Sequence, residues 1–600
     1  MDSWFTYLKQ GLSRKLPKDR IIGKENYSSI KTNLKNLRPF ISRHWRKGLL
    51  GSILIFFTSL LGFPQPLIFR YLVDNVILSR QLELLVGVIL LLLGIALAEK
   101  LASLLQQFYF ARFEQEVTLD IQHDLLERAL HFPKSFFDHN ETGYLMHRLS
   151  SDVQGVRWFF SSTIVYIITN FLRFVGGISL LFYLEWRLAI MVSVMLPGLW
   201  FSVRYFSGKI HALSHQGMEQ QAIVASRLQE SLSSVSLIKA FSSEFRAVRC
   251  LMSELKTAFQ ISLERTSVSS VANLAISSMP SIARTMVLAL GAYWIIQGQW
   301  TLGSLLAFQA YLGYVFGPAQ FLATTSLQFQ NAVAALERIS ALFDIVPEEN
   351  VGTGITVERL KGEIEFKNVS FSYDGYNQVL KDISFHVYPG EHVAIVGPSG
   401  VGKTTLLSLI LCFYKPSSGE IYFDGRPASD YEVGSLRRRI GYVSQDPLLI
   451  SGNIMQNLKY GNPDATQEQV IWAAMAAGIH QFIQSLPAGY ETEIGEKGVK
   501  LSQGQKQRLS IARALVKEPD VLVLDEPSSA LDRLTEKSLF QILPTLIRNK
   551  TLFVVSNRLS AIKEVHKILV LNENTIVATG THQSLIESNP YYRKFVVTAD

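Results

Sequence analysis

The segment His392–Thr404, which reads HVAIVGPSGVGKT, decides the fold of the second half of this chain. Its first five residues predict a buried strand, and the apolar run Thr405–Leu411 that follows predicts a helix. Between them, glycines let backbone N–H groups converge on phosphate oxygens, and the helix N-terminus adds positive potential. This order predicts a phosphate-binding loop, with a tight glycine turn as the alternative interpretation. The residues expected to bind the nucleotide are Gly397, Pro398, Ser399, Gly400, Val401, Gly402, Lys403, Thr404 and Thr405.

A second, acidic motif completes the chemistry of that loop. Val521–Leu524 predicts a buried strand that delivers Asp525 and Glu526 at its C-terminal end. Lys403 is expected to reach the β- and γ-phosphates, and Thr404 to ligate Mg²⁺. Asp525 is placed to hold Mg²⁺ through water, and Glu526 to accept a proton from the attacking water. The two motifs together predict nucleotide hydrolysis with Mg²⁺ as a cofactor.

The sequence around these motifs, from Gly362 onward, alternates short β-rich runs with helical stretches. Such alternation indicates an α/β domain. The β-rich runs are Glu363–Tyr373, His392–Val396, Val521–Leu524 and Thr551–Val555.

The composition indicates that the first half is of another kind. Of the 600 residues, 48% are hydrophobic and 18% are charged, against a usual charged share of about 25%. These values exclude a disordered chain, and the distant Cys250 and Cys412 exclude a disulfide-stapled scaffold. The net charge of +8 is compatible with nucleic-acid binding or with a membrane protein that has basic cytoplasmic edges.

The apolar residues gather in six blocks before residue 330, each near the roughly 20 residues with which a helix crosses a bilayer. Several blocks contain proline, which membrane helices tolerate. Buried core helices are the alternative, but they are rarely this long and uncharged. The predicted spans are Leu49–Val76, Leu84–Gln107, Phe159–Leu184, Leu188–Phe206, Val271–Ile296 and Leu305–Leu327.

Basic residues precede the first span, whereas residues 297–302 carry no charge. By the positive-inside rule both chain ends of this multi-pass protein are expected in the cytoplasm. Residues 1–25 show no cleavable signal peptide. Asn26–Trp45 is expected to lie along the membrane surface or to form a solvated basic tail. The basic residues that precede the first span are Lys31, Lys35, Arg38, Arg43, Arg46 and Lys47.

The expected architecture is multi-domain, with an all-α six-helix transmembrane domain followed by an α/β P-loop NTPase domain. Two long, polar, helix-patterned stretches are expected to continue the spans into the cytoplasm. The expected boundaries are 1–45 for an N-terminal segment, 46–330 for the membrane domain with loops 112–157 and 207–270, 331–361 for a linker, and 362–600 for the nucleotide-binding domain.

Close to the acidic motif, the chain resembles a known family. Residues 501–505, which read LSQGQ, resemble the signature of ATP-binding cassette (ABC) transporters. The resemblance implies ATP as the nucleotide and a dimer of cassettes that binds ATP between its two copies. It further implies that Ser502, Gly504 and Gln505 of one cassette contact ATP held by the phosphate loop of the other.

Further residues resemble that family in the same order. Tyr373 resembles the aromatic residue that stacks on adenine, Gln445 the Q-loop glutamine of the catalytic and metal site, and residues 529–532 the D-loop. Thr492–Gly498 resembles the X-loop of exporters, and the first long polar stretch, with FPKSFFD at residues 132–138, resembles exporters of the lipid A flippase and multidrug type.

The resemblance implies a half-transporter of a bacterial inner (cytoplasmic) membrane that exports or flips an amphiphilic lipid, peptide or drug by alternating access. An importer on the same fold and a membrane-anchored regulatory ATPase are the alternatives, whereas the six spans exclude a soluble nucleic-acid-processing ATPase. The expected partners are the bilayer, a substrate that could be anionic, and a second half-transporter, with a homodimer favoured over a heterodimer.

One residue departs from the family's catalytic motifs, and charged residues interrupt the apolar spans. Asn557 occupies the place of the family's switch histidine, so this catalytic position either retains activity through Glu526 or marks a degenerate site in a heterodimer. Within the spans, Arg173 and Arg284 are costly charges that either line the translocation path or pair with Glu99, which adjoins Lys100.

Overall fold

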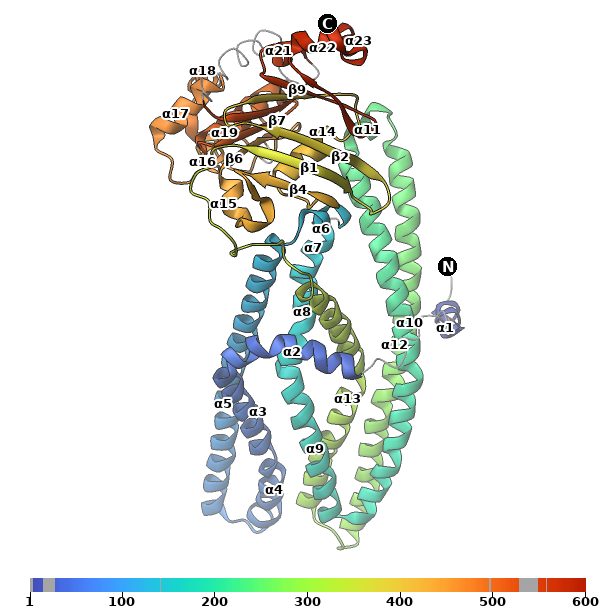
Figure 1. The fold of residues 1–600 in the computed structure, drawn as a ribbon. Helices are drawn as coiled ribbons and strands as arrows, with labels where there is room; N and C mark the ends of the chain where they lie inside the picture. The colour runs from blue at the N-terminus through green and yellow to red at the C-terminus, as the bar shows by residue number, and fades with distance from the viewer. Residues whose placement is uncertain are drawn as a thin grey trace. The chain divides into compact units, whose positions relative to one another are not determined.

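In a computed structural model, the chain forms two compact units (Figure 1), which are described separately below. The structure describes residues 4–13, 27–140, 142–495, 498–527, 549–556 and 558–599. Unit 1 comprises residues 1–127 and 143–345, and unit 2 comprises residues 128–142 and 346–600. A short segment from within the membrane half therefore belongs to the nucleotide-binding unit.

Unit 1 is entirely helical in its described residues. Five helical stretches are long and apolar enough to cross a membrane, namely 45–77, 82–130, 143–184, 186–233 and 244–296. The sixth predicted span lies within a further long helix, α13. The main helices are α1 (Trp4–Ser13), α2 (Tyr27–Arg43), α3 (Trp45–Gly62), α4 (Pro64–Tyr71), α5 (Leu82–Leu130), α9 (Ser162–Leu184), α10 (Trp186–Ser233), α11 (Val235–Ala240), α12 (Glu244–Ile296) and α13 (Leu302–Phe343).

The polar stretches after the second and fourth predicted spans are helical, as their patterning indicated. Helix α5 continues without a break for 49 residues, and α10 and α12 have 48 and 53 residues. Helices α10 and α12 run side by side and are joined by the short α11 (Figure 1). Helix α13 extends to Phe343 and so occupies the start of the segment expected to be a linker, 331–361, because its apolar face continues to Ile339 and Leu342, both buried.

The first span is interrupted at its prolines. Helix α3 ends at Gly62 and α4 begins at Pro64, where proline is tolerated because the first helical N–H needs no partner. A π-helical turn, Leu72–Ile77, follows α4. There, the Asp74 carboxylate accepts hydrogen bonds from Thr301 Oγ1 at 2.6 Å and Gly303 N at 2.8 Å, which ties this turn to the N-terminus of α13.

Unit 2 contains two sheets that fix the nucleotide-binding residues. The six-stranded sheet has the order β10-β9-β3-β8-β7-β6, and the four-stranded antiparallel sheet has the order β2-β1-β4-β5. The larger sheet is parallel from β9 through β3, β8 and β7 to β6. Its edge strand β10 pairs antiparallel with β9. The strands are β1 (Ile364–Ser372), β2 (Gln378–Val387), β3 (His392–Val396), β4 (Ser418–Phe423), β5 (Arg426–Pro427), β6 (Ile440–Val443), β7 (Val521–Asp525), β8 (Thr551–Val555), β9 (Lys567–Asn572) and β10 (Thr575–Gly580).

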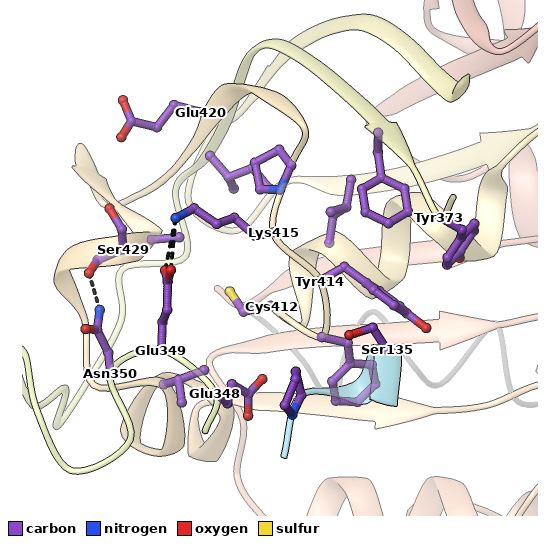
Figure 2. Close-up of a pocket in the computed structure, with 18 of the residues that line it drawn as sticks. Ser135, Glu348, Glu349, Asn350, Tyr373, Cys412, Tyr414, Lys415, Glu420 and Ser429 are labelled. Atoms are coloured by element: carbon purple, nitrogen blue, oxygen red, sulfur yellow. Dashed lines mark hydrogen bonds and ion pairs between the residues drawn. The ribbon is translucent and has the colours of Figure 1, made fainter. Parts of the chain in front are cut away.

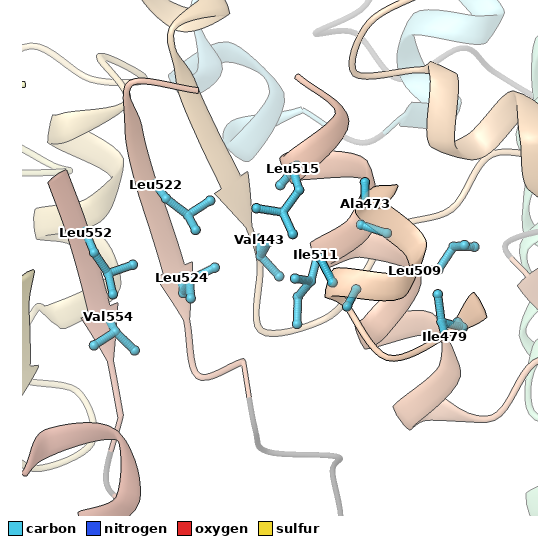
Figure 3. Packing of buried hydrophobic residues seen from close by; sticks show 14 of the residues in the cluster. Val443, Ala473, Ile479, Leu509, Ile511, Leu515, Leu522, Leu524, Leu552 and Val554 are labelled. Carbon is cyan, nitrogen blue, oxygen red and sulfur yellow. The ribbon is translucent and has the colours of Figure 1, made fainter. Parts of the chain in front are cut away.

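The central strands β3, β7 and β8 are buried at every position and mostly apolar because both of their faces are covered. Side chains alternate between the faces, so Leu522 and Leu524 of β7 join one core, and Val521 and Val523 join the other. Figure 3 shows the first core, in which β6, β7 and β8 face the helix α19 (Gln503–Val516). The second core is filled by α14 (Lys403–Ile410) and the smaller sheet. Unit 2 also contains α6 (Lys134–His139), α15 (Val433–Arg438), α16 (Ile454–Lys459), α17 (Gln467–Ala476), α18 (His480–Ser485), α21 (Leu559–Ile562), α22 (His582–Ser588) and α23 (Pro590–Ala599).

Candidate nucleotide-binding site

The predicted phosphate loop joins β3 to α14. Gly402 precedes the first residue of α14 with φ of 97°, a left-handed conformation that favours glycine. A Cβ at Gly402 would lie 2.8 Å from both the Val379 carbonyl oxygen and Leu380 Cδ2, so no larger residue fits without movement. Gly400 also has a positive φ of 82°, but a Cβ there would meet no protein atom within 4 Å. The loop is therefore packed against β2 on one side and open on the other.

The Lys403 side chain lies inside the loop. Its Nζ donates hydrogen bonds of 2.8 Å to the carbonyl oxygens of Gly397 and Pro398. The residue is buried, and burial lowers its pKa, opposed by the charges of Glu526 and Asp525. A buried lysine at a helix N-terminus favours an anion such as a phosphate.

The residues predicted to hold Mg²⁺ include two that meet beside this loop. The Thr404 side chain hydrogen-bonds to Asp525, the last residue of β7. Asp525 Oδ1 is buried and has no hydrogen-bond partner in the described part of the chain, and burial raises the pKa of this carboxyl. A hydroxyl and a buried carboxylate oxygen that lacks a partner fit the oxygen ligands that Mg²⁺ prefers.

The predicted base and the Q-loop glutamine are in direct contact. Gln445 Nε2 donates a 3.0 Å hydrogen bond to Glu526 Oε2. They meet because β6 and β7 are neighbours, with Val443 opposite Leu524, so both chains leave the sheet at the same edge. Glu526 has φ of 44°, a strained backbone for a non-glycine residue, and its N–H donates to the Val555 carbonyl oxygen at 3.0 Å. The hydrogen bond from Gln445 orients the carboxylate.

Tyr373, predicted to stack on adenine, lies just after β1 and is 45% exposed. Its hydroxyl is 3.1 Å from Thr405 Oγ1, within hydrogen-bond range, and so connects the ring to the first turn of α14. The ring of Tyr414 meets it edge to face, with centroids 5.1 Å apart. Its exposed face is therefore held in a fixed orientation next to the phosphate loop.

We expect Tyr373→Ala to raise the Kd for ATP about tenfold, because stacking of one base on an aromatic ring contributes about 1–3 kcal/mol. Tyr373→Phe keeps the ring and is expected to stay within about threefold of the original Kd. Isothermal titration with ATP and with inorganic triphosphate, which has no base, checks the cause. An equal loss of affinity for both ligands in Tyr373→Ala would contradict stacking.

The signature residues form the start of α19. Ser502 caps that helix, its Oγ accepting from Gln505 N at 3.3 Å, and Gln505 Oε1 accepts from Ser502 N at 2.9 Å. Gly504 lies in the same first turn. Ser502 and Gln505 are hydrogen-bonded to each other within that turn, and α19 packs on α16 and α17. One chain thus brings together the loop, Asp525, Glu526, Gln445 and Tyr373.

Some predicted residues lie outside the described part of the chain, and one neighbour of the site was missed. Asn557 and the D-loop residues 529–532 are among those outside. The missed residue is Tyr414, whose hydroxyl donates to the Asp138 carboxylate of α6. No local sequence signal marks this contact, because the two residues are 276 positions apart.

A cavity of about 550 Å³ lies beside Tyr373 within unit 2. Figure 2 shows Tyr373, Tyr414 and Ser135 towards one end of it and Glu349, Asn350 and Ser429 towards the other. Lys415 and Glu349 form an ion pair of 3.1 Å across it. Tyr414 and Asp138, which are hydrogen-bonded to each other, both line this cavity.

Comparisons with known proteins agree with this geometry. Residues 49–319 match the family described as ABC transporter transmembrane region, and residues 380–529 match the family described as ABC transporter. An ATP-dependent lipid A-core flippase of Syntrophus aciditrophicus is 31% identical over 576 residues, covering 96% of this chain and 95% of the flippase. YgaD of Bacillus subtilis, named as a candidate multidrug export ATP-binding/permease protein, is 33% identical over 557 residues, covering 90% of this chain and 96% of that protein.

A solved structure is similar over both units. It is a bacterial Atm1-family ABC exporter with ATP bound, at a TM-score of 0.79 and 26% identity, covering 92% of this chain and 98% of that one.

Proposed function

This chain belongs to the ABC transporter family as a half-transporter, and from that membership we propose how its residues hydrolyse ATP and what it carries. It is an ATP-hydrolysing membrane transporter of the exporter type. The relatives reported above are a multidrug exporter by name and a flippase. They do not favour an importer or a regulatory ATPase as the function of this chain. The contact between Gln445 and Glu526 beside the phosphate loop supports the catalytic assignment most directly.

Hydrolysis uses Glu526 as the general base. Its carboxylate accepts a proton from the water that attacks the γ-phosphate, and the Gln445 amide holds that carboxylate in position. Lys403 and the backbone N–H groups of the loop bind the phosphates, and the Tyr373 ring binds the base. The hydrogen bonds of Gln445, Lys403 and Tyr373 orient these side chains for the roles assigned to them.

Mg²⁺ supplies charge neutralisation of the β- and γ-phosphates when it is bound. Thr404, Gln445 and Asp525 are the residues that would hold it. The partnerless Asp525 Oδ1 supports this assignment. Because burial raises the pKa of Asp525, a divalent cation would stabilise the ionised carboxylate.

The half-transporter dimerises, and we assign the homodimer. The match to the two halves of an ABC transporter and the likeness to an ABC exporter structure support a site completed by a second copy. Glu526 is retained, which favours an active site in each copy despite Asn557. The basic residues before α3 support cytoplasmic chain ends in an inner membrane. The proposed substrate is amphiphilic, in keeping with a flippase and a multidrug exporter as relatives.

Inside-out vesicles that contain only this chain test the proposal. We expect them to accumulate a fluorescent amphiphilic dye with ATP and not with a non-hydrolysable analogue. Asn557→His is expected to change ATP turnover by less than about threefold, because Glu526 carries the proton transfer. If purified protein neither hydrolyses ATP nor accumulates dye until a second half-transporter is added, the homodimer is wrong.

A further inference from the structure

None of the roles assigned above involves α1, the helix at the start of the chain. We propose that α1 is a membrane-surface helix, which packs on α10 and α12 and places Phe5 in the lipid head-group layer. This role is separate from ATP hydrolysis and from the transport step. It rests on the way α1 packs on its neighbours, on its level along them, and on the apolar side chains that it leaves uncovered.

Helix α1 has a specific seat on α12 and α10. Gly11 is buried, and a Cβ there would lie 2.8 Å from Val268 Cγ2 and 3.2 Å from the Glu264 carbonyl oxygen, so glycine lets the two helices approach closely. At the C-terminal end of α1, where helix carbonyl groups lack partners within the helix, Lys209 Nζ of α10 donates a 2.7 Å hydrogen bond to the Leu12 carbonyl oxygen. These contacts hold α1 at one position along α10 and α12.

That position is just outside the predicted membrane-spanning parts of α10 and α12. The predicted spans end at Phe206 in α10 and begin at Val271 in α12. Lys209 and Val268, which contact α1, lie three residues beyond these ends, or about 5 Å at the helical rise of about 1.5 Å per residue. Head groups form a layer of roughly 5–8 Å on each side of the hydrocarbon core. Helix α1 is therefore at head-group level.

The face of α10 that holds α1 continues into the membrane as an apolar surface. Tyr205 and Phe201 precede Lys209 by about one and two helical turns, so the three side chains lie along one face of α10. The side chains of Tyr205 and Phe201 are 52% and 66% exposed. Figure 1 shows α1 beside α10 and α12, on the side away from α5. Exposed aromatic rings within a predicted span are expected to contact lipid, which places α1 next to lipid as well.

An apolar stripe of α1 is left uncovered beside this seat. Phe5, Leu8 and Leu12 follow one another at the spacing of a single helix face. Phe5 is 72% exposed and meets the exposed Trp4 ring edge to face, whereas Leu8 and Leu12 are half-buried. Lys9 borders the stripe one turn after Phe5, where its long side chain can reach lipid phosphates. Aromatic rings with a bordering lysine are typical of helices in the membrane interface.

Two labelled variants of the full-length protein test which side of α1 contacts lipid. Phe5→Cys and the matched control Gln10→Cys, on the exposed polar side of α1, each carry a small thiol-linked fluorophore. Both are made in a Cys250→Ser background because Cys250 is exposed, and that background alone measures labelling of the half-buried Cys412. The protein is studied without ATP in nanodiscs of phosphatidylcholine and phosphatidylglycerol. One quencher is phosphatidylcholine with a nitroxide on its head group, and the other is iodide in the water.

We expect the head-group nitroxide to quench the label at residue 5 at least about twofold more than the label at residue 10, and iodide to show the reverse order. Equal quenching of both labels by iodide would place Phe5 in water. Protection of residue 5 from both quenchers would mean that protein, such as a second copy of the chain, covers the stripe. Either result would overturn the proposal.

Cross-linking tests the seat independently of the labels. In the same background, Gly11→Cys with Val268→Cys brings two thiols together, because a Cβ at residue 11 would lie 2.8 Å from Val268 Cγ2. Mild oxidation is expected to give a disulfide within one chain, seen as a mobility change on a non-reducing gel. Gln10→Cys with Val268→Cys is the matched control and is expected to stay reduced. No cross-link in the first pair, or a covalent dimer in its place, would overturn the seat.

Discussion

Glu526→Gln is expected to reduce ATP turnover by at least about 10²-fold while leaving the Kd for ATP within about threefold. The amide is the same size as the carboxylate and can still accept the hydrogen bond from Gln445, which is 3.0 Å long in the structure. It cannot take up a proton, and general-base catalysis contributes about 10²–10⁴-fold. Phosphate release by the purified protein gives the rate, and isothermal titration gives the Kd.

Glu518→Gln is the matched control. Glu518 is another non-glycine residue with a positive φ, 49°, and its carboxylate accepts a hydrogen bond from Gln469 rather than from the site. Turnover should stay within about twofold in this variant. If Glu526→Gln retained more than a tenth of the original rate, a different group would have to accept the proton.

Gly402→Ala should destabilise the nucleotide-binding unit by about 2–5 kcal/mol. A left-handed conformation costs a residue with a Cβ about 1–2 kcal/mol, and forcing atoms into a packed site adds about 1–3 kcal/mol. The new Cβ would lie 2.8 Å from the Val379 carbonyl oxygen, a backbone atom that cannot turn aside as a side chain can. Thermal unfolding followed by circular dichroism should show the lower Tm.

Gly400→Ala separates packing from ligand binding in the same loop. Its φ of 82° carries a similar backbone cost, but the Cβ would meet no protein atom within 4 Å. Its Tm should therefore fall by less than that of Gly402→Ala, while its Kd for ATP rises because the Cβ enters the open side of the loop. Equal losses of Tm in the two variants would argue against the packing explanation.

The sequence predicted the elements of the nucleotide-binding unit closely where the signal was local. The runs His392–Val396 and Thr551–Val555 are the strands β3 and β8 without change, because strands covered on both faces are mostly apolar and so stand out as short apolar runs. The long helices of unit 1 were likewise indicated by hydropathy and length.

Contacts between distant segments could not be predicted in this way. The meeting of Gln445 and Glu526 depends on the pairing of β6 with β7, and only a resemblance to a family suggested that both residues serve one site. The hydrogen bond from Tyr414 to Asp138 follows from no pattern in either stretch. The partner of Glu99 also had to come from the structure, because the sequence offered only Arg173 and Arg284 as partners and the hydrogen bond comes from Gln65.

The discontinuous make-up of unit 2 has a consequence for biosynthesis. Residues 128–142 leave the ribosome about 200 residues before the rest of their unit begins at residue 346. At about 5–20 residues per second, they wait about 10–40 s for their first partners. During that interval Tyr414, to which Asp138 of this segment is bonded in the structure, has not been made. Residues 128–142 are thus among the last parts of the first half of the chain to meet the rest of their unit.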